Sequence, residues 1–220
     1  MNAVLRKISK VDKSSWNKLD IPKLPKWFRQ LLLQAYGNSI THKIEKQHLE
    51  RPPVDITIKT PELIDRFSTQ LKGKQIIKHS LRLENAGQIS ELPGFKEGEW
   101  WVQDISASIP VHLFNDVKGK SALDLCAAPG GKTMQLSAAG ANVTAVDLSK
   151  VRAAKLKENL ARTSLNANIV ISDLFKIKGF FDIIILDAPC SATGTVRRHP
   201  DLPYVKSHAD LRKLFRLQYS

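Results

Sequence analysis

Cysteine is scarce in this sequence, whose 220 residues contain only two, Cys126 and Cys190. Two widely separated thiols are too few for a disulfide scaffold, and neither has the spacing of a metal site. The sequence therefore predicts free thiols in a reducing compartment and no bound metal.

Long apolar runs are also absent. No stretch approaches the ~18 apolar residues that would indicate a transmembrane helix. The N-terminal residues contain no apolar core typical of a secretion signal, and no internal repeat is visible. We therefore expect a cytoplasmic protein without a membrane partner.

Acidic residues are few beside the basic ones: 21 Asp and Glu face 34 Lys and Arg, which gives a net charge of +13. The excess is +6 in residues 1–50, +1 in residues 51–120 and +6 in residues 121–220. Two basic regions favour a nucleic-acid partner, although a highly charged solvated surface remains an alternative. The hydrophobic content of 42% is enough for a packed core.

The pattern of apolar residues predicts three segments. Residues 1–50 form a basic helical segment with a break at Gly37, and residues 51–105 form a small α+β module. Residues 106–220 alternate strands and helices, which is typical of a Rossmann-like α/β domain with parallel strands. Its predicted strands are 122–127, 142–148, 168–172 and 180–186, with helices at 132–139 and 150–163.

One strand–turn–helix unit organises this α/β segment. An apolar run from Ala122 to Ala127 leads into Pro129-Gly130-Gly131 and then into a helical pattern. The next strand ends in Asp147, about 20 residues further on, where a carboxylate can accept hydrogen bonds from a ribose. The unit predicts a pocket for a nucleoside-containing cofactor. A glycine turn that binds nothing remains an alternative.

Two familiar nucleotide motifs are missing from the glycine turn. Gly131-Lys132-Thr133 matches the end of a phosphate-binding loop, but that motif requires a glycine at the position of Cys126. The dinucleotide pattern G-x-G-x-x-G is absent as well. A nucleotide hydrolase is therefore a weaker hypothesis, which would require binding of ATP or GTP with Mg²⁺.

Several chemically capable residues follow the predicted strands: Cys126, Asp147, Asp173, Asp187 and Cys190. Ligand crevices of open α/β sheets lie at the carboxyl ends of the strands, so we expect these residues to converge there. Alternatives remain for two of them. Cys190 has the size of a small buried hydrophobe, and Asp173 has the position of a helix N-cap.

Three motifs carry a specific resemblance. They read D-L-C-A-A-P-G-G-K-T at 124–133, D-A-P-C-S-A-T-G at 187–194 and R-R-H-P-D at 197–201. The first resembles the first motif of S-adenosylmethionine-dependent methyltransferases. Together they resemble the Sun/Fmu-type bacterial ribosomal RNA (cytosine-5) methyltransferases, a resemblance that covers most of residues 25–220.

The resemblance implies a set of site residues. The methionine part of S-adenosylmethionine would contact Cys126, Ala127, Ala128, Pro129, Gly130, Gly131 and Lys132. Asp147 would hold the ribose, Asp173 would lie by the adenine, and Asp187 would border both cofactor and target base. Cys190 would assist product release, and ribosomal RNA, expected from the small subunit, would contact Arg197, Arg198 and His199.

The family also places an attacking cysteine in a later Thr-Cys motif, which this sequence does not contain. We therefore expect a C-terminally truncated enzyme, or else a catalytically inactive fragment that binds RNA and cofactor. The family's strand order, 3-2-1-4, makes residues 180–186 an edge of the sheet. That edge is apolar, with Asp182 as its single charge, and predicts self-association.

Overall fold

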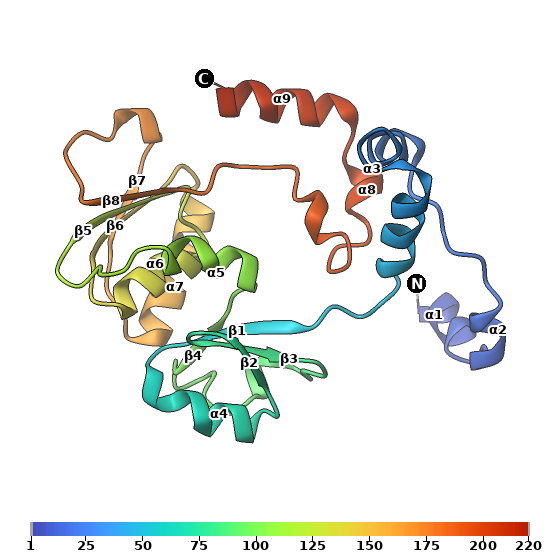
Figure 1. Ribbon diagram of the computed structural model, residues 1–220, viewed down its shortest axis with the longest axis horizontal. Coiled ribbons are helices and arrows are strands. Elements are labelled where there is room, and N and C mark those ends of the chain that lie inside the picture. The colour runs from blue at the N-terminus through green and yellow to red at the C-terminus, as the bar shows by residue number, and fades with distance from the viewer. Residues whose placement is uncertain (1, 220) are drawn as a thin grey trace. The chain divides into compact units, whose positions relative to one another are not determined.

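The computed structural model describes residues 2–219, without the side chains of Lys13 and Asn17. The chain divides into two compact units, residues 1–52 with 191–220, and residues 53–190 (Figure 1). This division differs from the three predicted segments. The C-terminal 30 residues associate with the N-terminal ones, and the α+β module shares a unit with the α/β sheet. Met1 and Ser220, which bound the predicted segments, lie outside the described residues.

The first unit is helical. Its helices are α1 Asn2–Ile8, α2 Lys13–Asn17, α3 Lys26–Gln47, α8 Leu202–Val205 and α9 His208–Tyr219, with a 3₁₀ turn at Thr193–Thr195. The sequence predicts both halves of α3 but not α1 or α2. Gly37 interrupts α3 with a φ of 74°, so the predicted break is confirmed.

A small apolar core joins the two ends of the chain within this unit. Phe28 of α3 is buried with Val196 and Leu202. The Trp27 ring stacks on Phe28, and its Nε1 donates to the Pro203 carbonyl at 2.9 Å. These two aromatic side chains therefore belong to the core.

The second unit begins with an antiparallel sheet in the order β2-β3-β1-β4. Its strands are β1 Val54–Ile58, β2 Lys74–Ile77, β3 Ser80–Leu83 and β4 Trp100–Val102, and its helix is α4 Ile64–Gln70. Short 3₁₀ helices lie at Pro61–Leu63 and Ile89–Glu91. Phe67 and Trp100 are fully buried in its core. The predicted α+β module thus contains one α-helix after its first strand, followed by three further strands.

The second sheet of this unit is parallel and has the order β7-β6-β5-β8. Its elements are α5 Ile105–His112, β5 Ser121–Leu125, α6 Gly131–Ala138, β6 Asn142–Asp147, α7 Lys150–Thr163, β7 Asn168–Ile171, a 3₁₀ helix Leu174–Lys176 and β8 Ile183–Leu186. In order of sequence these strands are 3-2-1-4. The predicted Rossmann-like topology is confirmed, because the strands pair in parallel and α6 and α7 connect successive strands.

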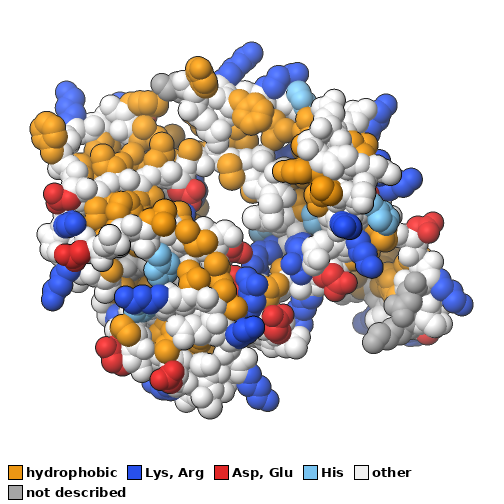
Figure 2. All heavy atoms as spheres, viewed as in Figure 1, with side chains coloured by type: hydrophobic (Ala, Val, Ile, Leu, Met, Phe, Trp, Pro, Cys, Tyr) orange, Lys and Arg blue, Asp and Glu red, His pale blue; other side chains and the backbone are white. Residues whose placement is uncertain are grey.

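The two faces of the parallel sheet differ. On one face, Ala122 and Ile183 pack in a core with Val111 of α5 and Leu136 of α6. On the other face, Ile184 and Leu186 of β8 are 57% and 56% exposed. Figure 2 shows hydrophobic side chains gathered over this part of the molecule. Ile183 and Ile185 are buried, so one face of this edge strand is covered while the other is open.

A buried polar network connects the two sheets of the second unit. The Gln103 Oε1 atom accepts hydrogen bonds from Thr57 Oγ1 and Trp101 Nε1, at 2.8 and 2.9 Å. Its Nε2 donates to Gln135 Oε1 at 3.0 Å, and Gln135 Nε2 donates to the Ser108 carbonyl. Because buried polar groups are costly without partners, this network fixes β4 against α6. Within residues 2–219, no helix is long and apolar enough to cross a membrane.

Candidate cofactor site

A cavity of about 450 Å³ opens at the carboxyl ends of β5 and β8, as the doubly wound topology predicts. We call it the carboxyl-end cavity. The sequence-predicted residues on its wall are Cys126, Ala127, Ala128, Pro129, Gly131, Lys132, Asp187 and Cys190. Residues on its wall that the sequence did not single out include Trp101, Asp104, Asp124, Met134, Arg152 and Asn159.

The glycine turn has a backbone that few sequences tolerate. Cys126 has a φ of 60° and Gly130 a φ of 107°, both in the left-handed region. A Cβ at Gly130 would overlap Leu156 of α7, so glycine is required there for space as well as for conformation. The Ala128–Pro129 peptide bond is cis. This conformation brings the first turn of α6 to the cavity wall.

Asp147 holds this turn through hydrogen bonds. It ends β6 with its side chain 2% exposed. Its Oδ2 accepts from the Ala128 N–H at 3.1 Å, and its Oδ1 accepts from the Ser149 N–H at 2.9 Å. Asp147 is not among the residues that line the cavity, so its contact with a ribose stays a prediction.

Arg152 is a site residue that sequence reasoning missed. Its guanidinium donates to the Ala128 carbonyl and lies 3.4 Å from Asp147 Oδ2. It therefore ties α7 to the glycine turn and to the end of β6. The sequence contained a signal for it. A positive charge in the first turn of a helix is repelled by the positive end of the helix dipole, so an arginine at this position indicates a partner outside the helix. Asn159 lies about two turns further along α7, and its side-chain amide donates to the Pro129 carbonyl at 2.9 Å.

Lys132 and Asp187 join the two strand ends across the cavity. Lys132 Nζ lies 2.7 Å from Asp187 Oδ2, and the Asp187 side chain is 62% exposed while that of Lys132 is 12% exposed. Cys190 is exposed and free on the same wall. The predicted convergence of Cys126, Asp187 and Cys190 is therefore observed.

The environment of the Cys126 thiol disfavours its ionisation, whereas an activated thiol has a lowered pKa. Burial, and then the negative charge of Asp147, raise its pKa. Since the thiolate is the nucleophile, a raised pKa disfavours attack by this sulfur. Cys126 is thus placed to shape the cavity wall.

Asp124 is a buried carboxylate beneath the turn. Burial raises its pKa to about 6, although a 2.6 Å hydrogen bond from Thr133 Oγ1 opposes the shift. Its other oxygen, Oδ1, has no hydrogen-bond partner within the described chain. This atom gives the cavity an acceptor that the protein itself does not satisfy.

The remaining predicted site residues lie elsewhere. Asp173 accepts from the Phe175 N–H at 3.1 Å as an N-cap, which was the alternative considered for it. It does not line the cavity, and its contact with adenine stays a prediction. Arg197, Arg198 and His199 belong to the first unit, where Arg197 donates to the carbonyls of Glu50 and Arg51 at 3.3 and 2.9 Å. Among residues 2–219, no group of three or more His, Cys, Asp or Glu is arranged to hold a metal.

Comparisons with known proteins agree with this architecture. The "Ribosomal RNA small subunit methyltransferase B" of Erwinia tasmaniensis is 37% identical over 209 residues, which cover 88% of this chain and 48% of that protein. The chain thus spans about half the length of the curated relatives that it matches.

Two solved structures share the fold. A methyltransferase homologue from Pyrococcus horikoshii has a TM-score of 0.68 at 25% identity, over 86% of this chain and 67% of that one. NSun6 from Pyrococcus horikoshii with SFG has a TM-score of 0.77 at 17% identity, over 90% of this chain and 78% of that one.

A family comparison identifies the relationship. Residues 111–220 match the family described as 16S rRNA methyltransferase RsmB/F. This match contains all three motifs on which the resemblance rests. S-adenosylmethionine is the cofactor of this family. The chain belongs to the RsmB/F family of 16S rRNA methyltransferases.

Proposed function

We propose that the carboxyl-end cavity binds S-adenosylmethionine for methyl transfer to C5 of a cytosine in small-subunit ribosomal RNA. The observation that carries the proposal is the junction of Lys132, Asp187 and Cys190 at the ends of β5 and β8. The methionine end of the cofactor is a zwitterion, and this wall offers groups of both signs. Lys132 and Arg152 suit a carboxylate, while Asp187 and the unpartnered Asp124 Oδ1 suit an ammonium group.

The turn and the strand ends would divide the contacts with the cofactor. Cys126 to Lys132 would surround the methionine part, Asp147 would reach the ribose and Asp173 the adenine. The carboxylates of Asp147 and Asp173 already accept hydrogen bonds from main-chain N–H groups. To contact the cofactor, each must accept a further hydrogen bond or give up one of these. Asp187, as the more exposed carboxylate, would border both the cofactor and the base.

Carbon methylation explains a cysteine beside an aspartate. C5 of cytosine is a weak nucleophile until a thiolate adds at C6, which places electron density on C5. The cofactor, when bound, supplies the methyl group. A base then removes the C5 proton, and the C5–C6 double bond re-forms as the thiolate leaves. Cys190, which is exposed on the cavity wall, would assist this release, as the family resemblance implies.

The substrate proposal rests on family and charge. A net charge of +13 suits a polyanion, and RNA is the polyanion on which the named relatives act. Arg197, Arg198 and His199 would face the RNA, and this substrate would place the protein in the cytoplasm.

A second proposal is that this chain binds RNA and cofactor without catalysing transfer. The observation that favours it lies in the sequence, because Cys126 follows Leu125 and Cys190 follows Pro189. Neither cysteine stands in the Thr-Cys motif that the family uses for attack.

Calorimetry and a transfer assay test both proposals. The 220-residue chain should bind S-adenosylmethionine, and the affinity should fall in Asp187→Asn but not in Glu158→Gln, which alters an exposed carboxylate elsewhere. A labelled methyl group is then offered with unmodified small-subunit rRNA, and the product nucleoside is identified. 5-Methylcytidine supports the first proposal, and cofactor binding without transfer supports the second. A chain that binds no cofactor contradicts both.

A further inference from the structure

A second cavity of about 510 Å³ lies in the second unit between the antiparallel sheet and α5–α6. We call it the hairpin cavity. It is lined by Lys78 and His79 from the turn between β2 and β3, and by His112 at the end of α5. Of its lining residues, Thr57, Trp101 and Gln135 also belong to the buried polar network, and Trp101 lines the carboxyl-end cavity as well; Lys78, His79 and His112 take part in neither. No motif of the proposed methyltransferase function accounts for it.

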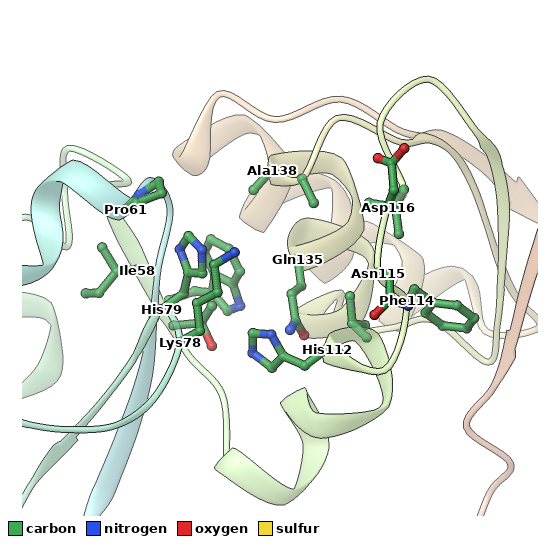
Figure 3. A pocket seen from close by; sticks show the side chains of 15 residues that line it. Ile58, Pro61, Lys78, His79, His112, Phe114, Asn115, Asp116, Gln135 and Ala138 are labelled. Atoms are coloured by element: carbon green, nitrogen blue, oxygen red, sulfur yellow. The ribbon is translucent and has the colours of Figure 1, made fainter.

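Three nitrogen-bearing side chains gather in this cavity. In Figure 3 the side chains of Lys78, His79 and His112 lie beside one another and point toward the same space. The Nε2 atom of His112 is buried and has no hydrogen-bond partner among the described residues. Lys78 is exposed and forms no ion pair within that part of the chain. A buried donor or acceptor without a partner is rare and needs an explanation.

The backbone supports a role for His79. This residue has a φ of 63°. Glycine and asparagine adopt this left-handed conformation more readily than histidine does, so an imidazole is held here against the local preference. Its carbonyl accepts from the Ile58 N–H at 2.7 Å, which fixes the turn on β1 and aims the side chain into the cavity.

We propose that the hairpin cavity binds a phosphate group through Lys78, His79 and His112. Several oxygens of one phosphate can accept from donors that converge from different elements. A divalent cation suits the cavity less. Lys78 would repel it, and among residues 2–219 no third His, Cys, Asp or Glu completes a metal site.

Charge explains why the site should respond to an anion. Burial, followed by the charge of Lys78, lowers the pKa of both His79 and His112, and the charge of His112 lowers the pKa of His79 further. Glu62 acts on His79 in the opposite direction, and Asp116 lies apart from the three side chains in Figure 3. Both imidazoles are therefore neutral at pH 7, and a bound anion would raise their pKa again by linkage.

The test uses the full chain with inorganic phosphate, pyrophosphate and sulfate, followed through the imidazole proton signals of His79 and His112. Sulfate keeps its charge between pH 5 and 8, so the pH dependence of its binding reports on the protein alone. Its affinity should rise at least about fivefold from pH 7.5 to 5.5, because protonation of the imidazoles is coupled to binding. Acetate at equal ionic strength is the control for general charge screening.

Variants separate the site from the overall charge. His79→Asn keeps a residue that tolerates the left-handed backbone, and His112→Gln and Lys78→Gln keep the size of the side chain. Each should weaken pyrophosphate binding about tenfold, the loss of one charge-assisted hydrogen bond. Lys74→Gln and His208→Gln change the same groups at exposed positions outside the cavity and should have no effect.

Two competitors then identify the source of the phosphate. Displacement of pyrophosphate by adenosine 5′-monophosphate indicates a free nucleotide, and displacement by a short single-stranded RNA indicates the RNA backbone. Either result supports the proposal. Unchanged imidazole signals at millimolar pyrophosphate, or equal binding by the three variants and the wild type, would overturn it.

Discussion

Lys132 Nζ and Asp187 Oδ2 lie 2.7 Å apart and connect the glycine turn after β5 to the loop after β8. These two strands are neighbours in the sheet, although 55 positions separate the two residues in the sequence. The pair therefore links the two motifs that carry the family resemblance. Because Asp187 is mostly exposed, the ion pair contributes little to stability, and its carboxylate remains accessible to a ligand.

Replacing Asp187 by Asn should leave the fold intact and weaken S-adenosylmethionine binding about 10- to 100-fold, the loss of a charge-assisted hydrogen bond. Calorimetry measures the affinity, and thermal unfolding checks the fold. Glu158→Gln is the matched control, since Glu158 pairs with Lys155 on an exposed helix surface. Equal affinity in Asp187→Asn and wild type would remove Asp187 from the cofactor site.

Asp147→Ala should have a larger effect on stability. The substitution leaves two main-chain N–H groups, of Ala128 and Ser149, without their acceptor. We expect the free energy of unfolding to fall by about 2–4 kcal/mol, measured by urea titration. Asp173→Ala removes one cap bond and should cost only ~1 kcal/mol.

Cofactor binding separates the structural from the ligand role of Asp147. At temperatures where Asp147→Ala remains folded, its S-adenosylmethionine affinity should fall by ~1.5–3 kcal/mol if the carboxylate also reaches the ribose. An affinity equal to that of the wild type would restrict Asp147 to holding the turn.

Asp124 should make stability depend on pH. Its pKa rises from 3.8 to about 6 in the folded chain, so between these values the folded protein binds more protons than the unfolded one. The resulting stabilisation is complete at low pH and is lost as the pH rises through 6, by up to about 3 kcal/mol. The difference in unfolding free energy between wild type and Asp124→Asn should change by about 2 kcal/mol between pH 4.5 and 7.5, because at pH 4.5 the unfolded carboxyl is already mostly ionised. Parallel curves for the two proteins would contradict the prediction.

RNA binding tests the arginine pair of the first unit. Replacing Arg197 and Arg198 by alanine should reduce the slope of log affinity against log salt by about one for each lost phosphate contact. Arg216→Ala, in an exposed position of α9, controls for net charge. Because Arg197 also donates to the carbonyls of Glu50 and Arg51, the stability of the double variant must be measured first. An unchanged slope would assign Arg197 and Arg198 a structural role.

The edge strand β8 should promote self-association of the 220-residue chain. Its outer face presents Ile184 and Leu186, and β8 is the last strand of the described sheet. Sedimentation at tens of micromolar should detect oligomers, and Ile184→Lys should reduce them because a charged edge resists pairing. Val151→Lys places the same charge on exposed α7 and should not. A monodisperse wild-type monomer with slow amide exchange in residues 183–186 would show the prediction to be wrong.

The sequence predicts most of the second unit because its strands and helices have clear periodicity and turn residues. The helix Lys150–Thr163 has its predicted bounds, and the strand order of the parallel sheet is the one that the family resemblance implies. The helices α1 and α2 were missed because they are short and none of their described side chains is buried. The pairing of residues 191–220 with the N-terminal residues depends on contacts such as Trp27 with Pro203, which no local pattern contains.

The residues of the candidate site also fall into those that the sequence predicts and those that only the structure reveals. The turn, Asp187 and Cys190 were predictable because motif and strand end coincide. A carboxylate that binds main-chain N–H groups has the same sequence signature as one that binds a ligand, so Asp147 and Asp173 required the structure. Arg152 was missed because its purpose depends on the carbonyl of Ala128, which lies opposite it only in the folded chain.

The first unit is assembled from both ends of the chain, with Trp27 bonded to Pro203 across 176 positions. During synthesis, this core cannot form until the ribosome has released the residues around Val196 and Leu202. Residues 53–190 are contiguous and need none of those late residues to close their two sheets. Domains fold as units as they emerge, so the second unit has the earlier opportunity to fold, and α3 must wait for its partner.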